Sequence, residues 1–161
     1  MVTVDIRKTR FDHPDAMKLN DLVQLEYVSR YGDGDLTEMA ATHFAAPQGQ
    51  YLLVYDADGT PVASGGWRAQ DASPEGFEDG DAEIKRMFVV SEARGRGLAR
   101  RLLAELEASA AAAGRTRMVL ETGSKQPEAI RLYETSGYTP VEKFGYYRDH
   151  ELSICMGKPL G

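Results

Sequence analysis

Residues 94–99, with the sequence RGRGLA, have the composition of a phosphate-binding turn. Gly95 and Gly97 allow the backbone to turn tightly and to approach a ligand closely. A valine-rich run of strand character precedes the turn, and the apolar residues after it have the spacing of an amphipathic helix. The first N–H groups of such a helix lack internal partners and lie at the positive end of its dipole, where a pyrophosphate is stabilised. The sequence therefore predicts an anion cradle, to which Arg94 and Arg96 add positive charge.

Spacing separates this turn from other phosphate-binding loops. A P-loop requires GxxxxGK followed by Ser or Thr, which the chain lacks, and a dinucleotide fingerprint requires a third glycine where Arg100 stands. The pattern that matches is Arg-x-x-Gly-x-Ala, at Arg94, Gly97 and Ala99, after a predicted strand that carries Glu83. These features resemble the pyrophosphate loop of the GNAT superfamily, the GCN5-related N-acetyltransferases. The resemblance implies acetyl-CoA as cosubstrate, with its pyrophosphate against Arg94, Gly95, Arg96, Gly97, Leu98 and Ala99.

Hydrophobic periodicity and turn residues predict the other elements. In chain order we expect a strand at 3–8, a helix from Pro14 to Gly32, a shorter helix after Asp35, a hairpin turning at Asp58-Gly59, an acidic loop at 70–81, the strand before the cradle and the helix after it, a strand at 117–122, a helix from Pro127 to Gly137, and strands within 138–144 and 151–158.

This order is that of the GNAT fold, and the resemblance covers nearly the whole chain. It implies an α/β (α+β) fold in which a mixed, mostly antiparallel sheet of six to seven strands is flanked by about four helices. The chain has 161 residues, 42% of them hydrophobic, which suits one domain over residues 1–161 with a single core.

Acetyl transfer to an amine needs a base that accepts the proton of the nucleophile. The resemblance makes Glu83 the first candidate, because it lies eleven residues before Arg94. Histone-type GNATs place their glutamate base at this distance before the loop arginine. Burial in a cleft would raise the pKa of such a glutamate and suit it to this role. The alternative for Glu83 is a strand-end carboxylate paired with Lys85 or Arg86. Glu121, at the end of the next predicted strand, is the second candidate for the base.

Two further roles are the polarisation of the thioester carbonyl and the protonation of the departing thiolate. In GNAT enzymes a backbone N–H polarises the carbonyl where the fourth strand bulges away from the fifth, and the matching residues are Met87, Phe88 and Val89. Tyr133 matches the tyrosine that lies near the cofactor sulfur in many members, and its phenol stays protonated at neutral pH. The alternative for Tyr133 is a core tyrosine. Where the family often has Asn, this chain has Gln126 or Pro127.

Composition argues against several other classes of protein. The net charge of −6 disfavours nonspecific binding to nucleic acid or to an anionic membrane. A single cysteine, Cys155, and three histidines without ligand spacing suggest neither a disulfide scaffold nor a metal site. The sequence shows no apolar run long enough to span a membrane and no signal peptide, so we expect a cytoplasmic protein without a metal cofactor.

The sequence therefore predicts an acetyl-CoA-dependent N-acetyltransferase that works by direct attack in a ternary complex. The acceptor stays open among an amino acid, a polyamine, an aminoglycoside, a peptide N-terminus and a protein lysine. The acidic segment 75–83 is able to attract a cationic amine, and His150, Tyr146 and Tyr147 lie in a segment that borders the acceptor pocket in this fold. The alternatives are a noncatalytic acyl-CoA sensor on the same fold and a nucleotide-binding regulatory domain. Dimers are frequent in the family, so a homodimer is one expected assembly.

Overall fold

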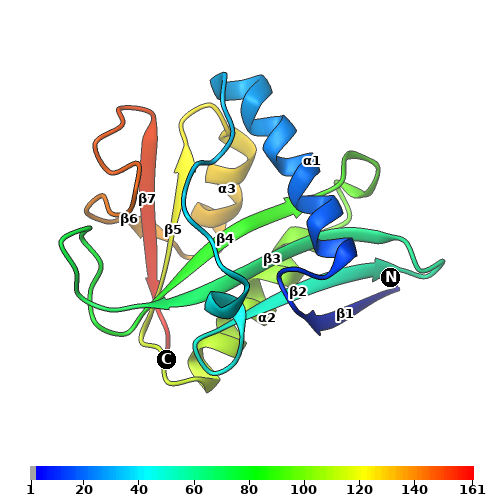
Figure 1. Ribbon diagram of the computed structural model, residues 1–161, viewed down its shortest axis with the longest axis horizontal. Helices are drawn as coiled ribbons and strands as arrows, with labels where there is room; N and C mark the ends of the chain where they lie inside the picture. Colours follow the sequence, from blue (N-terminus) through cyan, green and yellow to red (C-terminus); the bar gives the residue numbers. More distant parts are fainter. Residues whose placement is uncertain (1–2) are drawn as a thin grey trace.

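The computed structural model describes residues 3–161, in which a seven-stranded sheet is flanked by three α-helices (Figure 1). The elements are β1 (Val4–Thr9), α1 (Pro14–Tyr31), the 3₁₀ helix η1 (Ala41–Phe44), β2 (Gly49–Asp56), β3 (Pro61–Gln70), β4 (Asp81–Val89), the 3₁₀ helix η2 (Ser91–Ala93), α2 (Leu98–Ala112), β5 (Arg117–Gly123), α3 (Pro127–Thr135), β6 (Thr139–Pro140) and β7 (Ser153–Pro159).

The sheet has the strand order β1-β2-β3-β4-β5-β7-β6. Neighbouring strands are antiparallel except for β4 and β5, which are parallel and joined through α2. This parallel pairing is short, because only Asp81–Glu83 of β4 face Arg117–Val119 of β5. Beyond Glu83 the two strands diverge, as Figure 1 shows, so the sheet is split between β4 and β5 from this residue onward.

The two faces of the sheet are covered by different helices. The larger core cluster packs α2 and α3 against one face and is centred on Trp67, Leu102 and Leu106, all of which are almost fully buried. The second cluster packs α1 and η1 against the opposite face through Leu19 and Phe44. In Figure 1, α1 and α2 accordingly lie on opposite sides of the sheet. None of the helices within residues 3–161 combines the length and hydrophobicity that crossing a bilayer requires.

Turn and cap residues explain where several elements begin and end. Pro14 occupies the first turn of α1, where its missing N–H costs nothing, and the helix ends at Gly32 in the left-handed conformation with φ 82°. The hairpin between β2 and β3 turns at Asp58-Gly59, as predicted. The helix from Pro127 is confirmed as α3, and the strand predicted within 138–144 is reduced to Thr139–Pro140.

The short helix predicted after Asp35 is wrong. Residues 35–40 have no regular structure, and one turn of 3₁₀ helix follows at Ala41–Phe44. The side chain of Asp35 accepts a hydrogen bond from the backbone N–H of Thr37 at 2.9 Å. The side-chain amide of Gln24 also binds the backbone N–H and C=O of Asp35, at 2.7 and 3.1 Å. These bonds replace those of a helix, because short polar side chains compete for backbone groups.

Candidate active site

A cavity of about 290 Å³ lies where β4 and β5 diverge. One wall consists of α1 and the loop that follows it, two others are the diverging strands, and the segment before β7 closes the remaining side. The lining residues that carry polar or aromatic side chains include Tyr27, Tyr31, Asp33, Asp35, Lys85, Arg86, Glu121, Gln126, Tyr147 and His150. Of the three residues that the family resemblance placed beside the acceptor pocket, Tyr147 and His150 border this cavity, whereas Tyr146 is not among its lining residues.

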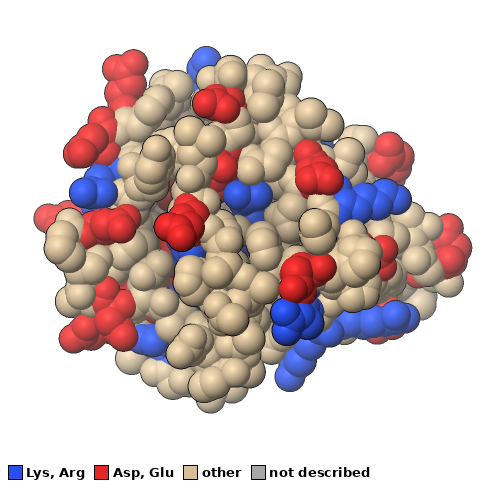
Figure 2. Space-filling view, in the orientation of Figure 1, with Lys and Arg blue, Asp and Glu red and all other residues tan. Residues whose placement is uncertain are grey.

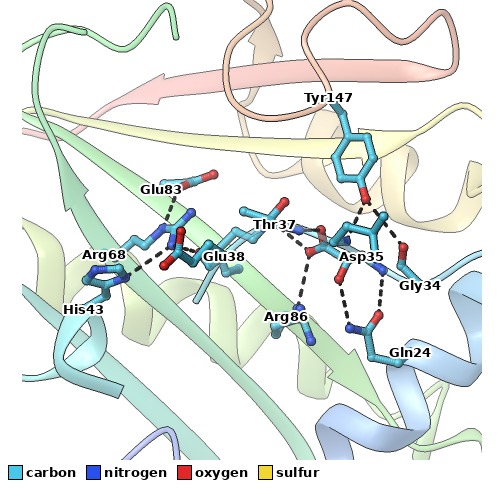
Figure 3. A network of polar contacts seen from close by, with 12 residues as sticks. Gln24, Gly34, Asp35, Thr37, Glu38, His43, Arg68, Glu83, Arg86 and Tyr147 are labelled. Atoms are coloured by element: carbon cyan, nitrogen blue, oxygen red, sulfur yellow. Dashed lines mark hydrogen bonds and ion pairs between the residues drawn. The ribbon is translucent and has the colours of Figure 1, made fainter. Parts of the chain in front are cut away.

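Three charged groups, Asp35 of the loop with Lys85 and Arg86 of β4, form a cluster on the wall of this cavity. Figure 3 shows Asp35 beside Arg86. The ammonium of Lys85 lies 3.1 Å and the Nε of Arg86 lies 3.4 Å from the same oxygen, Oδ2, of Asp35. Burial by itself would raise the pKa of Asp35, but Lys85, Thr37 and Arg86 together hold it below its usual value. Asp35 is therefore a fixed negative charge between two cations.

The loop that carries Asp35 is tied to the segment before β7. The backbone N–H of Leu36 donates to the hydroxyl of Tyr147 at 2.7 Å, and this hydroxyl lies 3.5 Å from the carbonyl of Gly34 (Figure 3). A single phenol thus connects two segments that are distant in sequence on opposite sides of the cavity. These contacts, together with the two hydrogen bonds between the Gln24 side chain and the Asp35 backbone, fix the position of the loop after α1.

β4 bulges beside the cavity. Lys85 pairs with Gly66 of β3, and Phe88 pairs with Ser64. Two residues of β4 therefore lie between these paired positions where β3 has one, so β4 carries one extra residue. Arg86 is at the bulge and has a φ of 60°, which is costly for a residue with a long side chain. The bulge that the family resemblance implied is therefore present, and it begins at Arg86. Because β4 has no pairing with β5 beyond Glu83, the Met87–Val89 backbone makes no ladder bonds to β5.

Glu121 on β5 lines the same cavity. Glu121 lies two positions after Val119, which pairs with Glu83 on β4. Its side chain is therefore on the same face of the sheet as that of Glu83. Burial raises the pKa of Glu121 from 4.5 to about 7; Lys85 opposes this rise, while the negative charges of Asp35 and Glu83 add to it. A carboxyl group with a pKa near neutrality is suited to accept and return protons.

The predicted anion cradle is formed by the turn between η2 and α2. Gly95 and Gly97 have φ values of 83° and 76°, and Gly97 is the N-cap of α2 without any side-chain cap. Within residues 3–161, the N–H groups of residues 95–100 donate to no backbone carbonyl. A Cβ atom added to either glycine would have no atom within 4 Å. The turn therefore presents a row of unpaired donors next to open space, as an anion requires.

The two arginines of the cradle have partners on neighbouring elements. Arg94 donates to the carbonyl of Val89 at 3.0 Å and to Glu26 of α1 at 2.9 Å. Arg96 binds both carboxylate oxygens of Asp56, at 3.1 and 3.0 Å. Both side chains therefore fix the turn to the rest of the molecule, and the unpaired donors of the cradle are backbone groups.

The comparison with known families agrees with this geometry. The model described as Acetyltransferase (GNAT) family matches residues 16–138. The chain belongs to this family. It is 39% identical over 146 residues to a protein named IAA acetyltransferase from Azospirillum brasilense, a match that covers 86% of this chain and 90% of that relative.

Solved structures show the same fold. A protein from Klebsiella pneumoniae that is described as an acyl-CoA N-acyltransferase is 27% identical to this chain, with a TM-score of 0.79 and coverage of 99% of both chains. A GNAT-family acetyltransferase from Staphylococcus aureus is only 13% identical, yet it superposes with a TM-score of 0.72 over 99% of this chain and 100% of its own. The molecule is thus an N-acetyltransferase with the GNAT fold.

Glu83 of this GNAT lies in a buried ion pair (Figure 3). Its Oε1 accepts from the Nε of Arg68 at 2.8 Å and from the side-chain amide of Gln70 at 3.0 Å. The Glu83 side chain is 5% exposed, and it is not among the residues that line the cavity. The sequence anticipated an ion pair as the alternative role of Glu83, but with Lys85 or Arg86, both of which instead contact Asp35.

Tyr133 of the GNAT is on α3 and belongs to the larger core cluster. Its ring packs edge-on against Tyr138 with the ring centroids 5.8 Å apart. Burial raises the pKa of the Tyr133 phenol, so it stays protonated at neutral pH. Tyr133 does not line the cavity itself, but Tyr27 does. Burial is the main cause that raises the pKa of the Tyr27 phenol, and Asp35 and Tyr133 add to it.

Sequence reasoning did not single out Asp35, Tyr27 or Tyr31. Asp35 ends the run Gly-Asp-Gly-Asp at 32–35, which has the composition of any solvated loop. The two tyrosines have ordinary helical spacing, which equally suits a core position.

On the face shown in Figure 2, acidic side chains gather toward the edge formed by the loop between β3 and β4, where Asp71, Glu75, Glu78 and Asp79 are exposed.

Proposed function

We propose that this protein transfers the acetyl group of acetyl-CoA to the primary amine of a small acceptor, by direct attack in a ternary complex. The observation that carries the proposal is the carboxyl group of Glu121, with a pKa of about 7, on the wall of a cavity at the divergence of β4 and β5. β4 leads from this cavity through η2 to the row of unpaired N–H groups at residues 95–100. A pyrophosphate at that row would direct the acyl end of the cofactor toward the cavity.

Glu121 takes the role of base in this mechanism, and the first candidate, Glu83, takes a structural one. The nitrogen lone pair of the acceptor attacks the thioester carbonyl carbon, and Glu121 accepts the proton that the nitrogen loses. Glu83 is less suited to this step because Arg68 and Gln70 already bind its Oε1, and Arg68 would be left without its charged partner if Glu83 became protonated.

The other two roles fall to the residues that the family resemblance indicated. The backbone of Met87, Phe88 and Val89 follows the bulge at Arg86 and makes no ladder bonds to β5, and an N–H of this segment would stabilise the developing oxyanion. When the carbon–sulfur bond breaks, Tyr133 gives its phenolic proton to the thiolate of coenzyme A. The products are the acetylated amine and free coenzyme A.

Two experiments test this proposal in sequence. Calorimetric titration with acetyl-CoA, run beside ATP and NAD, tests the cradle, and we expect stoichiometric binding of acetyl-CoA alone. Thiol release with a panel of amines then tests transfer, and we expect release that depends on the acceptor. Binding of acetyl-CoA without release for any amine would instead support a noncatalytic acyl-CoA sensor. Preferential binding of ATP or NAD would refute the cofactor assignment.

A further inference from the structure

The buried charges on the cavity wall do not balance. Lys85 and Arg86 are both cationic, and their side chains are only 10% and 7% exposed. They share one carboxylate, that of Asp35, which is 12% exposed. Of the other two acids on the wall, Glu121 is ionised only in part at neutral pH because of its burial, and Asp33 is exposed to solvent. The buried cluster of Lys85, Arg86 and Asp35 therefore holds an excess of positive charge that water reaches poorly, and an anion would compensate it.

Arg86 is the cation with unused hydrogen-bonding capacity. Its Nε is buried and has no hydrogen-bond partner within residues 3–161, because the contact with Asp35 at 3.4 Å lacks the required alignment. Within the described residues, Asp35 is the single carboxylate that lies within 4 Å of this guanidinium. A guanidinium presents a planar fork of donors that fits a carboxylate. Arg86 also lines the cavity, so a bound acceptor would lie beside its side chain.

The backbone at Arg86 provides a second sign of function. Its φ of 60° would be relaxed by Gly or Asn, which adopt this conformation at little cost. A long side chain held in a costly conformation at the wall of a cavity is typical of binding sites. Arg86 thus combines strain, burial and an unpaired donor.

We propose that Arg86 binds a carboxylate of the acceptor, so that the acceptor is a small free amino acid whose amine is directed toward Glu121. This inference rests on the proposed function. Polyamines and aminoglycosides fit poorly, because they would add positive charge next to the buried cluster of Lys85, Arg86 and Asp35, which already has an excess. The cavity, at about 290 Å³, is at the lower end of the range for ligand sites. Its aromatic and aliphatic wall, with Tyr27, Tyr31 and Leu36, favours an apolar side chain on the amino acid.

The first test uses the unmodified protein saturated with coenzyme A and measures binding by calorimetry. The probes are phenylalanine and leucine, each compared with its carboxamide, which keeps the amine and the side chain but lacks the negative charge. We expect each amino acid to bind at least about tenfold more tightly than its amide, because a hydrogen bond between charged groups is stronger than one to a neutral amide. Equal binding of acid and amide, or binding of neither acid, overturns the inference.

The second test replaces the guanidinium without disturbing the backbone. Arg86→Asn removes the donors and suits the positive φ, so we expect the preference for acid over amide to disappear while acetyl-CoA affinity is unchanged. Arg10→Gln is the control, because Arg10 is an exposed arginine paired only with Asp12; it should retain the full preference. An Arg86→Asn protein that still prefers the acid overturns the assignment of Arg86.

These readouts separate the two proposals. Amino acids that bind in preference to their amides, in a protein that releases no thiol, support the carboxylate site and contradict the transferase mechanism. Thiol release that is as fast with the amides as with the acids supports the mechanism and overturns the carboxylate site.

Discussion

Replacing Glu121 by Gln should make the protein more stable at alkaline pH while it slows acetyl transfer by about 10²–10⁴-fold. Burial raises the pKa of Glu121 from 4.5 to about 7, so the fold favours the protonated carboxyl. A raised pKa means that the contribution of Glu121 to stability is fully present below about pH 4.5 and is lost as the pH rises through about 7. Gln resembles the protonated carboxyl and does not ionise, so the variant avoids this loss.

The expected size of the effect follows from the shift. Each pKa unit corresponds to about 1.4 kcal/mol, so ionisation of Glu121 costs the folded state roughly 3 kcal/mol above neutral pH. About 2 kcal/mol of this difference arises between roughly pH 5.5 and pH 8.5. For a chain of this length, that change corresponds to roughly 4–8 °C in Tm.

The assay is urea unfolding of the wild type and of Glu121→Gln across this pH range, with the difference in unfolding free energy taken at each pH. Glu105→Gln is the matched control, because Glu105 is exposed on α2, and its difference should stay within about 0.5 kcal/mol. In parallel, kcat/KM for acetyl transfer should rise through pH 7 in the wild type. Glu121→Gln should lose that rise and about 10²–10⁴-fold in rate.

Two results would refute this reasoning. A stability difference between Glu121→Gln and the wild type that does not change with pH would mean that Glu121 titrates like an exposed glutamate. A variant with nearly full activity and an unchanged pH profile would show that another group accepts the proton of the amine.

Three further substitutions test the remaining roles. Gly97→Val should weaken acetyl-CoA binding at least about tenfold in calorimetry, because it places a branched side chain in the open space of the cradle at a φ of 76°; Gly97→Asn controls for the backbone, and unchanged affinity of the valine variant would contradict the cradle. Tyr133→Phe should keep acetyl-CoA affinity and lower kcat by about 10²-fold, whereas an unaltered rate would leave Tyr133 a core residue. Glu83→Gln should cost up to about 3–5 kcal/mol in urea unfolding, because it leaves Arg68 buried without its charged partner; a loss of rate without loss of stability would restore Glu83 as the base.

Features that depend on neighbouring residues could be predicted from the sequence alone. Gly95 and Gly97 predicted the turn, and the apolar spacing that starts at Leu98 predicted α2, so the row of free N–H groups followed from local rules. The start of α1 at Pro14 and the hairpin at Asp58-Gly59 depend on the same kind of local preference, and both were predicted correctly. The resemblance to a known family added the type of sheet, mixed and mostly antiparallel with six to seven strands, which the structure confirms.

Features that depend on distant residues were decided by the tertiary structure. Glu83 and Glu121 are alike in sequence, since each is a glutamate on a strand, and only the packing distinguishes them. Arg68 on the neighbouring strand neutralises Glu83, whereas burial and the surrounding charges shift Glu121 toward neutrality. The excess of cations around Asp35 likewise results from the bulge and the loop, which bring residues about fifty positions apart into contact. Local preferences therefore determined the turn with its row of unpaired N–H groups, while desolvation and long-range charge, which no short stretch of sequence encodes, decided which side chains are available for chemistry.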